Sequence, residues 1–574
     1  MRLVLSGHGA SKGNALGHAR LRLPHVLDVA EDRIDAAAVD AELARLHAAV
    51  ATVRSEMLAL RDRLHGALAH EVGEFIDMHT LLLDDPELLR GIEELIRKGL
   101  YGANYALRLQ RDRLATLFAD MDDAYFRNRI DDIDHVIGRL HAALHKRDVA
   151  MRGVAGEVLV TDNVAPSELA QLQSQGVVAI VTTGGSALSH SAILARSLHL
   201  PLVVGAAQAL QLVNDGDVLA VDGSGGQVVV EPGAVDLRAY RTRVREEKRE
   251  RKQLHRLRRE PSRTLDGVDI RVYANAESRA DVAEAHALGA AGVGLYRTEF
   301  LFMGAQLPDE DAQFRAYRDV ALGMTGRTVT IRTLDIGADK ADRTGLALSD
   351  EPNPALGLRG VRLSLARAGI FETQMRAIVR ASGYGPIRVL VPMVSSRDEV
   401  VAVAALLRRV RRDLVSEGHE IAEHIPLGAM IEVPAAAIAL PGFIDAVDFL
   451  SVGTNDLIQY LLAADRNNEA LGELYTPLHP ALLRLLESVI RIARRRGRTV
   501  AVCGEMAGDA RFAPLLLALG LEEFSLHPGT LLELRHAIRA CDLGILRARA
   551  SALLRARDRA GIEKWMQANT PTGT

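Results

Sequence analysis

The pattern of apolar positions along the chain changes near residue 262, and the part beyond it is the most regular. There, short apolar runs alternate with longer segments of helical periodicity. The apolar runs read IRVYANA, GVGLYRTE, TVTIRTLD, IRVLVPMV, LGAMIEVP, FLSVGTND, TVAVCGE and EFSL. Strand–helix units repeated in this way are typical of a closed parallel barrel. We therefore predict a TIM-like (β/α)8 barrel over residues 262–574.

Residues 22–147 show helical periodicity instead of alternating strands and helices. An apolar stripe with spacings of three and four positions indicates a helix that packs against a neighbouring helix. The stripe consists of Leu43, Leu46, Val50, Val53, Met57 and Leu60. A second helical pattern covers roughly residues 69–97, with Pro86 in the first turn of a helix. We predict an α-helical subdomain over residues 22–147.

Strand patterns return after residue 147, in the runs GEVLVTD, GVVAIVTT, LPLVVG, DVLAVDG and QVVVEP. With the short helical pieces between them, they predict an α/β domain over residues 148–232. We expect the Gly-rich residues 1–21 to join this domain across the helical insertion. Residues 233–261 read as a charged helix. Its interleaved acidic and basic side chains favour a solvated linker over a patch that binds nucleic acid.

The composition limits the classes of protein to consider. The chain has 574 residues, 70 basic and 74 acidic side chains and a formal net charge of −4, which gives no reason to expect nucleic-acid binding. No apolar run approaches the length of a membrane span, and the N-terminus lacks the apolar stretch of a secretory signal. Two cysteines, Cys503 and Cys541, cannot form a disulfide framework. We expect a cytoplasmic, multidomain protein without membrane insertion.

One histidine stands out by its setting. His190 lies in GGSALSHSAILARSLHLPLVVG, where a Gly-Gly turn precedes Ser189–His190 and a short apolar helix follows. Free N–H groups and the macrodipole at a helix N-terminus favour an anion. A neutral imidazole is also a competent nucleophile near pH 7. The segment fits a histidine that carries a phosphoryl group, and it fits equally a histidine that only opens a helix.

Polar side chains follow the predicted barrel strands, where such barrels place their functional groups. They are Arg297, Arg332, Arg359, Glu432, Asn455, Asp456, Arg466 and Cys503. Guanidinium groups can grip a carboxylate or a phosphate bidentately, so phosphoenolpyruvate, which carries both, suits this set. Glu432 and Asp456 suit Mg²⁺, which prefers hard oxygen ligands. Cys503 is a candidate general acid or, alternatively, an inert buried thiol.

These segments resemble a known family. SHxxIxAR followed by a Leu-Pro strand is similar to the phosphohistidine motif of Enzyme I of the bacterial phosphotransferase system, phosphoenolpyruvate synthase and pyruvate phosphate dikinase. His190 matches the histidine that carries the phosphoryl group. One departure is that Gly184–Gly185 lie three residues before Ser189–His190 instead of two, with Ser186–Leu188 between them. Including the ASxGxAxG-like start, the resemblance to Enzyme I (phosphoenolpyruvate-protein phosphotransferase) runs along the whole chain.

The resemblance implies roles for the candidate residues and for the domains. Phosphoenolpyruvate would be bound by Arg297, Arg332, Arg359, Asn455 and Arg466. Glu432 and Asp456 would be the Mg²⁺ ligands, and Cys503 would be the proton donor to the pyruvate enolate. The helical subdomain resembles the domain that docks the phosphocarrier protein HPr, and its docking surface would include Met78, His79, Leu82 and Leu83. The family also implies a homodimer formed through the barrel domain.

The sequence therefore predicts an Mg²⁺-dependent phosphotransferase with a phosphohistidine intermediate. The phosphoryl group would pass from phosphoenolpyruvate to His190 and then to a histidine of HPr, which starts the sugar phosphotransferase relay. A synthase or dikinase is disfavoured, because the chain has no GxxxxGK[ST] loop and no counterpart of an ATP-grasp region. The remaining alternative is a catalytically weakened regulatory paralogue that binds phosphoenolpyruvate or HPr without efficient transfer.

Overall fold

A computed structural model of the chain forms two compact units, Met1–Arg251 and Lys252–Thr574. The description covers residues 2–22, 31–63, 79–80, 82–83, 85–119, 133, 136–141, 143–144, 155–164, 166–185, 190–198, 200–302, 306–337, 351, 353–466, 471 and 473–570. The predicted docking residue Met78, the predicted neighbour Ser189 and the segment Ser186–Leu188 lie outside the described residues.

The first unit contains an eight-stranded mixed sheet in the order β1-β8-β7-β3-β4-β5-β6-β2. Its strands are β1 (Leu3–Ser6), β2 (His8–Ser11), β3 (Asn14–Arg22), β4 (Glu157–Thr161), β5 (Ala179–Thr182), β6 (Leu202–Val204), β7 (Val218–Asp222) and β8 (Gln227–Val230). Strand β3 pairs in parallel with β4 and antiparallel with β7. The first strands of the chain thus share one sheet with strands that follow residue 155, and the segment between them is inserted.

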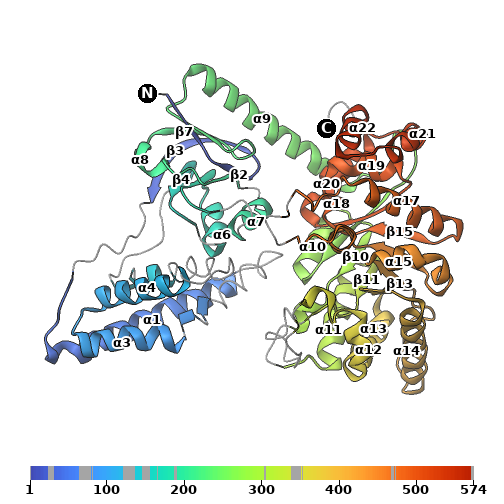
Figure 1. The fold of residues 1–574 in the computed structure, drawn as a ribbon, viewed down its shortest axis with the longest axis horizontal. Coiled ribbons are helices and arrows are strands. Elements are labelled where there is room, and N and C mark those ends of the chain that lie inside the picture. The colour runs from blue at the N-terminus through green and yellow to red at the C-terminus, as the bar shows by residue number, and fades with distance from the viewer. Residues whose placement is uncertain are drawn as a thin grey trace. The chain divides into compact units, whose positions relative to one another are not determined.

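In the described part of the inserted segment, every regular element longer than one 3-10 turn is an α-helix. The segment contains α1 (Val39–Arg63), α3 (Pro86–Gly99) and α4 (Ala103–Ala119), which pack against one another (Figure 1). The predicted apolar stripe, from Leu43 to Met57, forms the buried face of α1, since Leu46 and Val53 are fully buried and Met57 is 2% exposed. Pro86 begins α3, as predicted, because proline is tolerated where its missing N–H would have no partner within the helix.

The helices that accompany the sheet include α6 (Pro166–Ser174), α7 (His190–Ser197) and α8 (Ala209–Leu212). The longer charged helix α9 (Ala234–Arg256) follows the last strand, where the sequence predicts a linker helix. Helix α7 buries Leu194 and Ala195 against β2 and α6. The side chain of Ser191 donates a hydrogen bond to the carbonyl of Val164 at 2.7 Å, and this contact holds the first turn of α7.

The second unit is a closed barrel of eight parallel strands, which confirms the predicted architecture. The strands are β9 (Arg271–Ala276), β10 (Gly292–Tyr296), β11 (Thr328–Arg332), β12 (Ile387–Val391), β13 (Leu427–Ile431), β14 (Phe449–Val452), β15 (Thr499–Val502) and β16 (Glu523–Leu526). Each falls within one of the eight apolar runs read from the sequence. The barrel closes because β16 pairs in parallel with β9, with Phe524 opposite Val272.

Helices surround the barrel and cover its apolar outer face (Figure 1). They are α10 (Arg279–Ala287), α11 (Glu310–Gly323), α12 (Val361–Ala366), α13 (Ala368–Ala381), α14 (Arg397–Ser416), α15 (Pro434–Ala439), α16 (Thr454–Leu462), α17 (Pro480–Arg495), α18 (Glu505–Gly508), α19 (Ala513–Ala518), α20 (Leu531–Arg539), α21 (Leu543–Leu554) and α22 (Arg559–Asn569). Capping boxes begin α10 at Ser278 and α14 at Ser396. These caps satisfy the first free N–H groups of each helix and fix where it starts.

The barrel interior is filled by side chains and is not an open pore. Leu295, Leu390, Met430, Phe449 and Cys503 form one buried apolar cluster. Nearer the start of the strands, the guanidinium of Arg388 stacks 4.4 Å from the ring centroid of Phe449. Because the interior is packed, we expect substrate binding and catalysis in the loops that follow the strands.

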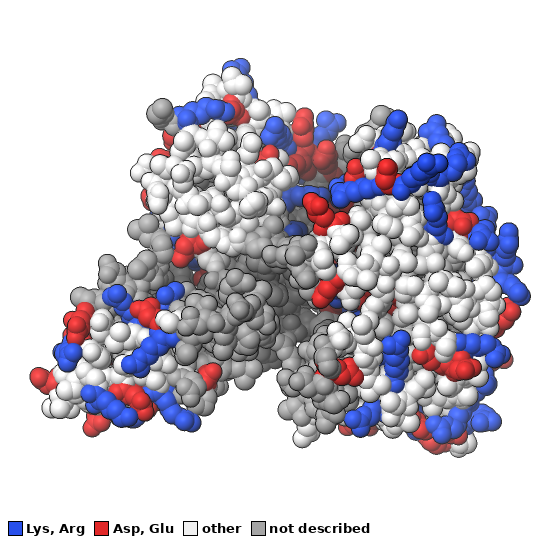
Figure 2. Space-filling view, viewed as in Figure 1, with Lys and Arg blue, Asp and Glu red and all other residues white. Residues whose placement is uncertain are grey.

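The surface carries both signs of charge. On the face drawn in Figure 2, acidic side chains lie beside basic ones on each unit. Among the residues that the structure describes, no helix combines the length and the apolar character needed to cross a membrane.

Candidate functional site

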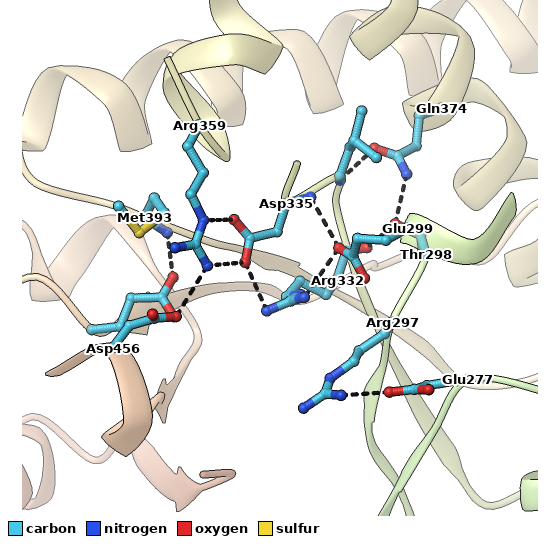
Figure 3. A network of polar contacts seen from close by, with 12 residues as sticks. Glu277, Arg297, Thr298, Glu299, Arg332, Asp335, Arg359, Gln374, Met393 and Asp456 are labelled. Atoms are coloured by element: carbon cyan, nitrogen blue, oxygen red, sulfur yellow. Dashed lines mark hydrogen bonds and ion pairs between the residues drawn. The ribbon is translucent and has the colours of Figure 1, made fainter. Parts of the chain in front are cut away.

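The predicted barrel residues lie where strands end, as the strand order requires. Arg332 is the last residue of β11 and Arg297 directly follows β10. Glu432 follows β13, Asp456 lies in the first turn of α16 after β14, and Cys503 follows β15. Because all eight strands are parallel, these ends lie at the same face of the barrel. Figure 3 shows how the charged members meet.

A chain of ion pairs joins two of the predicted arginines to a predicted carboxylate. Arg332 Nη1 lies 3.0 Å from Asp335 Oδ2, and Arg359 Nε donates to Asp335 Oδ1 at 3.0 Å. Arg359 Nη2 also donates to Asp456 Oδ2 at 3.1 Å. Arg332 Nη2 lies 3.0 Å from Glu299 Oε1. The structure thus brings Arg332, Arg359 and Asp456 together through Asp335, as Figure 3 shows.

Burial makes this network strong. The side chains of Arg332 and Arg359 are only 11% and 16% exposed, and that of Asp335 is 1% exposed. Desolvation acts to lower the pKa of Arg332, but the neighbouring charges of Glu299 and Asp335 outweigh it and raise that pKa. The pKa of Arg359 is raised against the same desolvation by Asp335 and Asp456. Both guanidiniums are therefore permanent cations at the mouth of the barrel.

Glu432 occupies a crowded, acidic position beside the network. It is 1% exposed, and its Oε1 accepts a hydrogen bond at 2.6 Å from the backbone N–H of Met393, a residue held in the left-handed conformation at φ 57°. A Cβ on Gly453, just before α16, would lie 2.7 Å from Glu432 Oε2, so the glycine lets the carboxylate approach the start of that helix. Burial, and then the charges of Asp335 and Asp456, raise the pKa of Glu432 to about 8.

This acidic corner fits a divalent cation. Asp456 Oδ1 is buried and, among the described residues, has no hydrogen-bond partner. The carboxylates of Asp335 and Asp456 repel that of Glu432, and a bound cation would relieve this repulsion. Within the described ranges, no three His, Cys, Asp or Glu side chains are grouped so that they could hold a metal ion by themselves. A site with two protein carboxylates is what Mg²⁺ commonly uses when a phosphorylated substrate supplies further oxygens.

Arg297, Asn455 and Arg466 lie outside the buried ion-pair chain. Arg297 is partly exposed and pairs with Glu277, which follows β9 (Figure 3). The Asn455 side chain exchanges two hydrogen bonds with Glu505: Nδ2 donates to Oε1 at 3.1 Å, and Oδ1 accepts from the backbone N–H at 2.9 Å. Arg466 lies in the turn after α16 and is exposed. Arg297 and Asn455 thus lie where the strands end, and Arg466 interacts electrostatically with Tyr475, whose hydroxyl donates to the backbone carbonyl of Asn455 at 3.1 Å.

Cys503 is buried at the end of β15, 4% exposed. Its backbone carbonyl accepts a hydrogen bond at 3.1 Å from Asn275 Nδ2, and Asn275 Oδ1 in turn accepts one at 2.6 Å from Ser525 Oγ. This relay runs through residues of β9 and β16 and fixes the backbone at Cys503. Burial raises the pKa of the thiol to about 11, and Sγ donates a hydrogen bond to the backbone carbonyl of Val452 at 3.5 Å. Cys503 therefore holds its proton at neutral pH.

The raised pKa predicts slow alkylation of Cys503 by iodoacetamide at pH 7. Only the thiolate reacts, so a shift from the ordinary pKa of 9.0 to about 11 lowers the reactive fraction by roughly 100-fold, before burial slows access further. Because an acid with a raised pKa stays protonated, the rate will rise with pH until about pH 11. Mass spectrometry of the Cys503 peptide between pH 7 and 10, with glutathione as reference, measures this. A rate that levels off near pH 7 would contradict it.

His190 is the first residue of α7, an eight-residue helix, which agrees with its predicted place at a helix N-terminus. The preceding turn is anchored by Gly184, whose N–H donates to the carbonyl of Asp162 at 3.0 Å. Gly185 has φ 90°, a conformation that glycine adopts without strain. His190 belongs to the first unit, whereas the ion-pair network belongs to the second.

The predicted docking residues are mostly packed inside the helical segment. His79 is 2% exposed and Leu83 is fully buried, while Leu82 is partly exposed. In this conformation His79 and Leu83 therefore contribute to packing, and of these three side chains only Leu82 reaches the surface. A helical periodicity shows that a residue lies on an apolar face, but it does not tell which apolar face is covered by the protein itself.

Sequence reasoning missed several residues of the site. Glu277 follows β9, and Glu505 begins α18 shortly after β15. Both are charged side chains after an apolar strand, which is the feature that identified the predicted residues. Asp335 and Glu299 share this feature, but no role was assigned to them. Asn275 and Ser525 lie within strands, and nothing in the sequence indicated their contact with Cys503.

The chain matches known proteins along most of its length. Three sequence families match the chain: the N-terminal part of PEP-utilising enzymes at residues 6–129, their mobile domain at 153–226 and their PEP-binding domain at 251–543. The chain is 44% identical over 552 residues to a phosphoenolpyruvate-protein phosphotransferase of Cupriavidus necator, and the match covers 94% of each chain. It is 41% identical over 540 residues to the protein so named in Geobacillus stearothermophilus, covering 93% of each, and 39% identical over 543 residues to one in Staphylococcus aureus, covering 94% of each.

Proposed function

The chain belongs to the phosphoenolpyruvate-protein phosphotransferase family, and from this premise we propose that it acts by two successive phosphoryl transfers through His190. It is an enzyme (EC 2.7.3.9) of the phosphotransferase system and transfers the phosphoryl group of phosphoenolpyruvate. In the proposal, the first transfer goes from phosphoenolpyruvate to the imidazole of His190. The second goes from His190 to a histidine of an HPr-type phosphocarrier protein, which starts the sugar phosphotransferase relay.

The single observation that carries the proposal is the buried ion-pair network at the mouth of the barrel. Arg332 and Arg359 are fixed cations in a site with little water, where a hydrogen bond to an anion is stronger than at the surface. Phosphoenolpyruvate has two anionic groups, and the two guanidiniums supply donors in two directions. Arg297, Asn455 and Arg466 complete the proposed substrate site.

The proposed cofactor is Mg²⁺, with Glu432 and Asp456 as its protein ligands. Asp456 Oδ1, which has no hydrogen-bond partner in the described part of the chain, and the close approach of Glu432 to Gly453 support this choice. When bound, the cation supplies neutralising charge for the phosphate oxygens. The protein's own contribution is to hold the two carboxylates in place: Glu432 through the Met393 N–H, and Asp456 through Arg359.

In the first transfer, a nitrogen of the His190 imidazole attacks phosphorus and the bond from phosphorus to the enol oxygen breaks. Phosphoryl transfer requires alignment and charge stabilisation, which the arginines provide. The leaving group is the enolate of pyruvate, and its methylene carbon must gain a proton. Cys503 supplies this proton, since its raised pKa keeps the thiol protonated until the basic carbon forms next to it. The thiolate that remains takes a proton back from solvent.

In the second transfer, the α/β domain carries the phosphoryl group to HPr docked on the helical subdomain, residues 22–147. The imidazole must visit two sites, so a swivel about the segments near residues 21, 147 and 233–261 is part of the proposal. Of the proposed docking residues, Leu82 would contact HPr directly, and the buried His79 and Leu83 would support the shape of that surface. Residues 262–574 would form the homodimer, and the enzyme would work in the cytoplasm.

The proposal is tested by following the phosphoryl group from labelled phosphoenolpyruvate to a purified HPr. With Mg²⁺ present, we expect pyruvate and labelled HPr in equal amounts, and with a chelator neither. Glu432→Gln should weaken the apparent Mg²⁺ affinity by roughly 100-fold or more, because it removes a charged ligand. The matched control is Glu523→Gln, which replaces a buried carboxylate at the opposite end of the strands. Phosphoenolpyruvate binding without any labelled product would instead support the weakened regulatory paralogue.

A further inference from the structure

Asp335 is a buried carboxylate to which the proposed steps assign no role. It lies in the segment that follows β11, three residues after Arg332, and its side chain is 1% exposed. Its backbone N–H donates a hydrogen bond to Glu299 Oε1 at 3.0 Å. Glu299 Oε1 is also the oxygen that pairs with Arg332. Glu299 therefore fixes the backbone of Asp335, in addition to the contacts that the Asp335 carboxylate makes with the two arginines.

Both oxygens of Asp335 are engaged by guanidinium groups. Oδ1 accepts from Arg359 Nε at 3.0 Å, and Oδ2 accepts from Arg359 Nη2 at 3.2 Å, which makes a bidentate pair. Oδ2 also lies 3.0 Å from Arg332 Nη1. One carboxylate thus sets the distance and the relative orientation of two cations (Figure 3).

The two arginines come from segments that need such a link. Arg332 ends a barrel strand, whereas Arg359 lies in an irregular segment between the 3-10 turn Pro354–Leu356 and α12. The next residue, Gly360, has φ 59°, and a Cβ there would lie 2.8 Å from Met393 Cβ and 3.3 Å from Asp335 Oδ1. The glycine therefore lets this segment pass close to the carboxylate. Fixing a long side chain such as arginine costs rotamer entropy, and in a preformed ion pair that entropy is lost on folding and not when the ligand binds.

The link leaves donors free for a ligand. Each guanidinium has five N–H donors, and Asp335 uses only some of them. Arg332 Nε is buried and has no hydrogen-bond partner among the described residues. Asp335 itself is unsuited to contact phosphoenolpyruvate, because a carboxylate repels an anion at short range.

We propose that Asp335 is a positioning residue that presets Arg332 and Arg359 as one paired anion receptor for phosphoenolpyruvate. This inference rests on the proposed roles of the two arginines. Asp335 acts through them and makes no contact with the substrate. Its removal would leave Arg332 paired with Glu299 and Arg359 paired with Asp456, but it would break the link between the two arginines. The loss would therefore fall on substrate affinity more than on the stability of the barrel.

The test is a double-mutant cycle on phosphoenolpyruvate affinity. Calorimetric titration with phosphoenolpyruvate and Mg²⁺ is carried out on full-length protein bearing His190→Ala, so that no transfer accompanies binding. We expect Asp335→Asn to raise Kd about 10-fold or more. In protein that already carries Arg359→Lys, the same change should raise Kd less than about 3-fold, because the link is already broken. Glu523→Gln, which removes another buried carboxylate of the barrel, should leave Kd unchanged.

Three results would overturn the proposal: an unchanged Kd for Asp335→Asn, additive effects in the cycle, or an equal effect of Glu523→Gln. Misfolded protein lowers the binding stoichiometry but not the Kd of the folded fraction, so calorimetry separates the two. If Asp335→Asn yields no folded protein, Asp335→Glu is measured in its place. Moving the charge by one methylene should weaken binding, and binding equal to wild type would overturn the proposal. These measurements do not depend on His190, so they can fail while the two-step transfer holds.

Discussion

Replacing His190 with alanine is expected to reduce phosphoryl transfer from phosphoenolpyruvate to HPr by roughly 10⁴-fold or more. In the proposed cycle the imidazole is the nucleophile of the first step and the leaving group of the second, and no other side chain of the unit is assigned that role. The Kd for phosphoenolpyruvate should stay unchanged, because the binding residues lie in the other unit. Steady-state transfer to purified HPr and calorimetric binding measure the two quantities.

The matched control for this change is His8→Ala. His8 is an exposed histidine on β2 of the same unit, so its replacement tests for general effects of losing an imidazole from that domain. It should retain wild-type transfer. Substantial transfer by the His190→Ala protein would contradict the proposed cycle, and a loss of transfer in both variants would show that the effect is not specific to position 190.

Replacing Cys503 with alanine should reduce the rate of pyruvate formation by roughly 10²- to 10⁴-fold, the usual contribution of a positioned general acid. The thiol is protonated at neutral pH because burial raises its pKa to about 11, and it lies at the barrel face that carries the arginines. Phosphoenolpyruvate binding should change little, since Cys503 makes no ion pair with the network. Single-turnover measurement of pyruvate, alongside calorimetric binding, separates the two effects.

Cys541→Ala is the control for loss of a buried thiol. Cys541 is also buried, but its Sγ donates to the carbonyl of Ala537 within α20, away from the strand ends. This variant should form pyruvate at the wild-type rate. If Cys503→Ala formed pyruvate as fast as wild type, a different proton donor would have to be sought, and the rest of the proposed cycle would be unaffected.

The barrel could be predicted from the sequence because its strands are buried on both faces. Runs such as GVGLY and LGAMI carry no charged side chain and are buried throughout, so their ends are sharply marked. In a parallel barrel all strand ends that lead into functional loops share one face, so the order of elements alone places Arg332, Glu432 and Cys503 near one another. The structure places them as this reasoning required.

The details of the network could not be read from the sequence, because they depend on contacts between distant segments. Asp335 lies three residues from Arg332 but 24 from Arg359, and only the folded loop shows that it joins them. The relay from Ser525 through Asn275 to Cys503 spans more than 220 residues. The burial of His79 and Leu83 could not be predicted either, because an apolar helical stripe fits a protein core as well as a docking surface.

The most direct test of the two-step cycle is to locate the covalent phosphoryl group. The enzyme is incubated with phosphoenolpyruvate and Mg²⁺ without HPr, digested near neutral pH and analysed by mass spectrometry with fragmentation that preserves phosphohistidine. We expect one phosphoryl group per chain, on the peptide that contains His190, stable to base, labile to acid and removed when HPr is added. A phosphoryl group on a different residue, or transfer to HPr with no covalent intermediate, would contradict it.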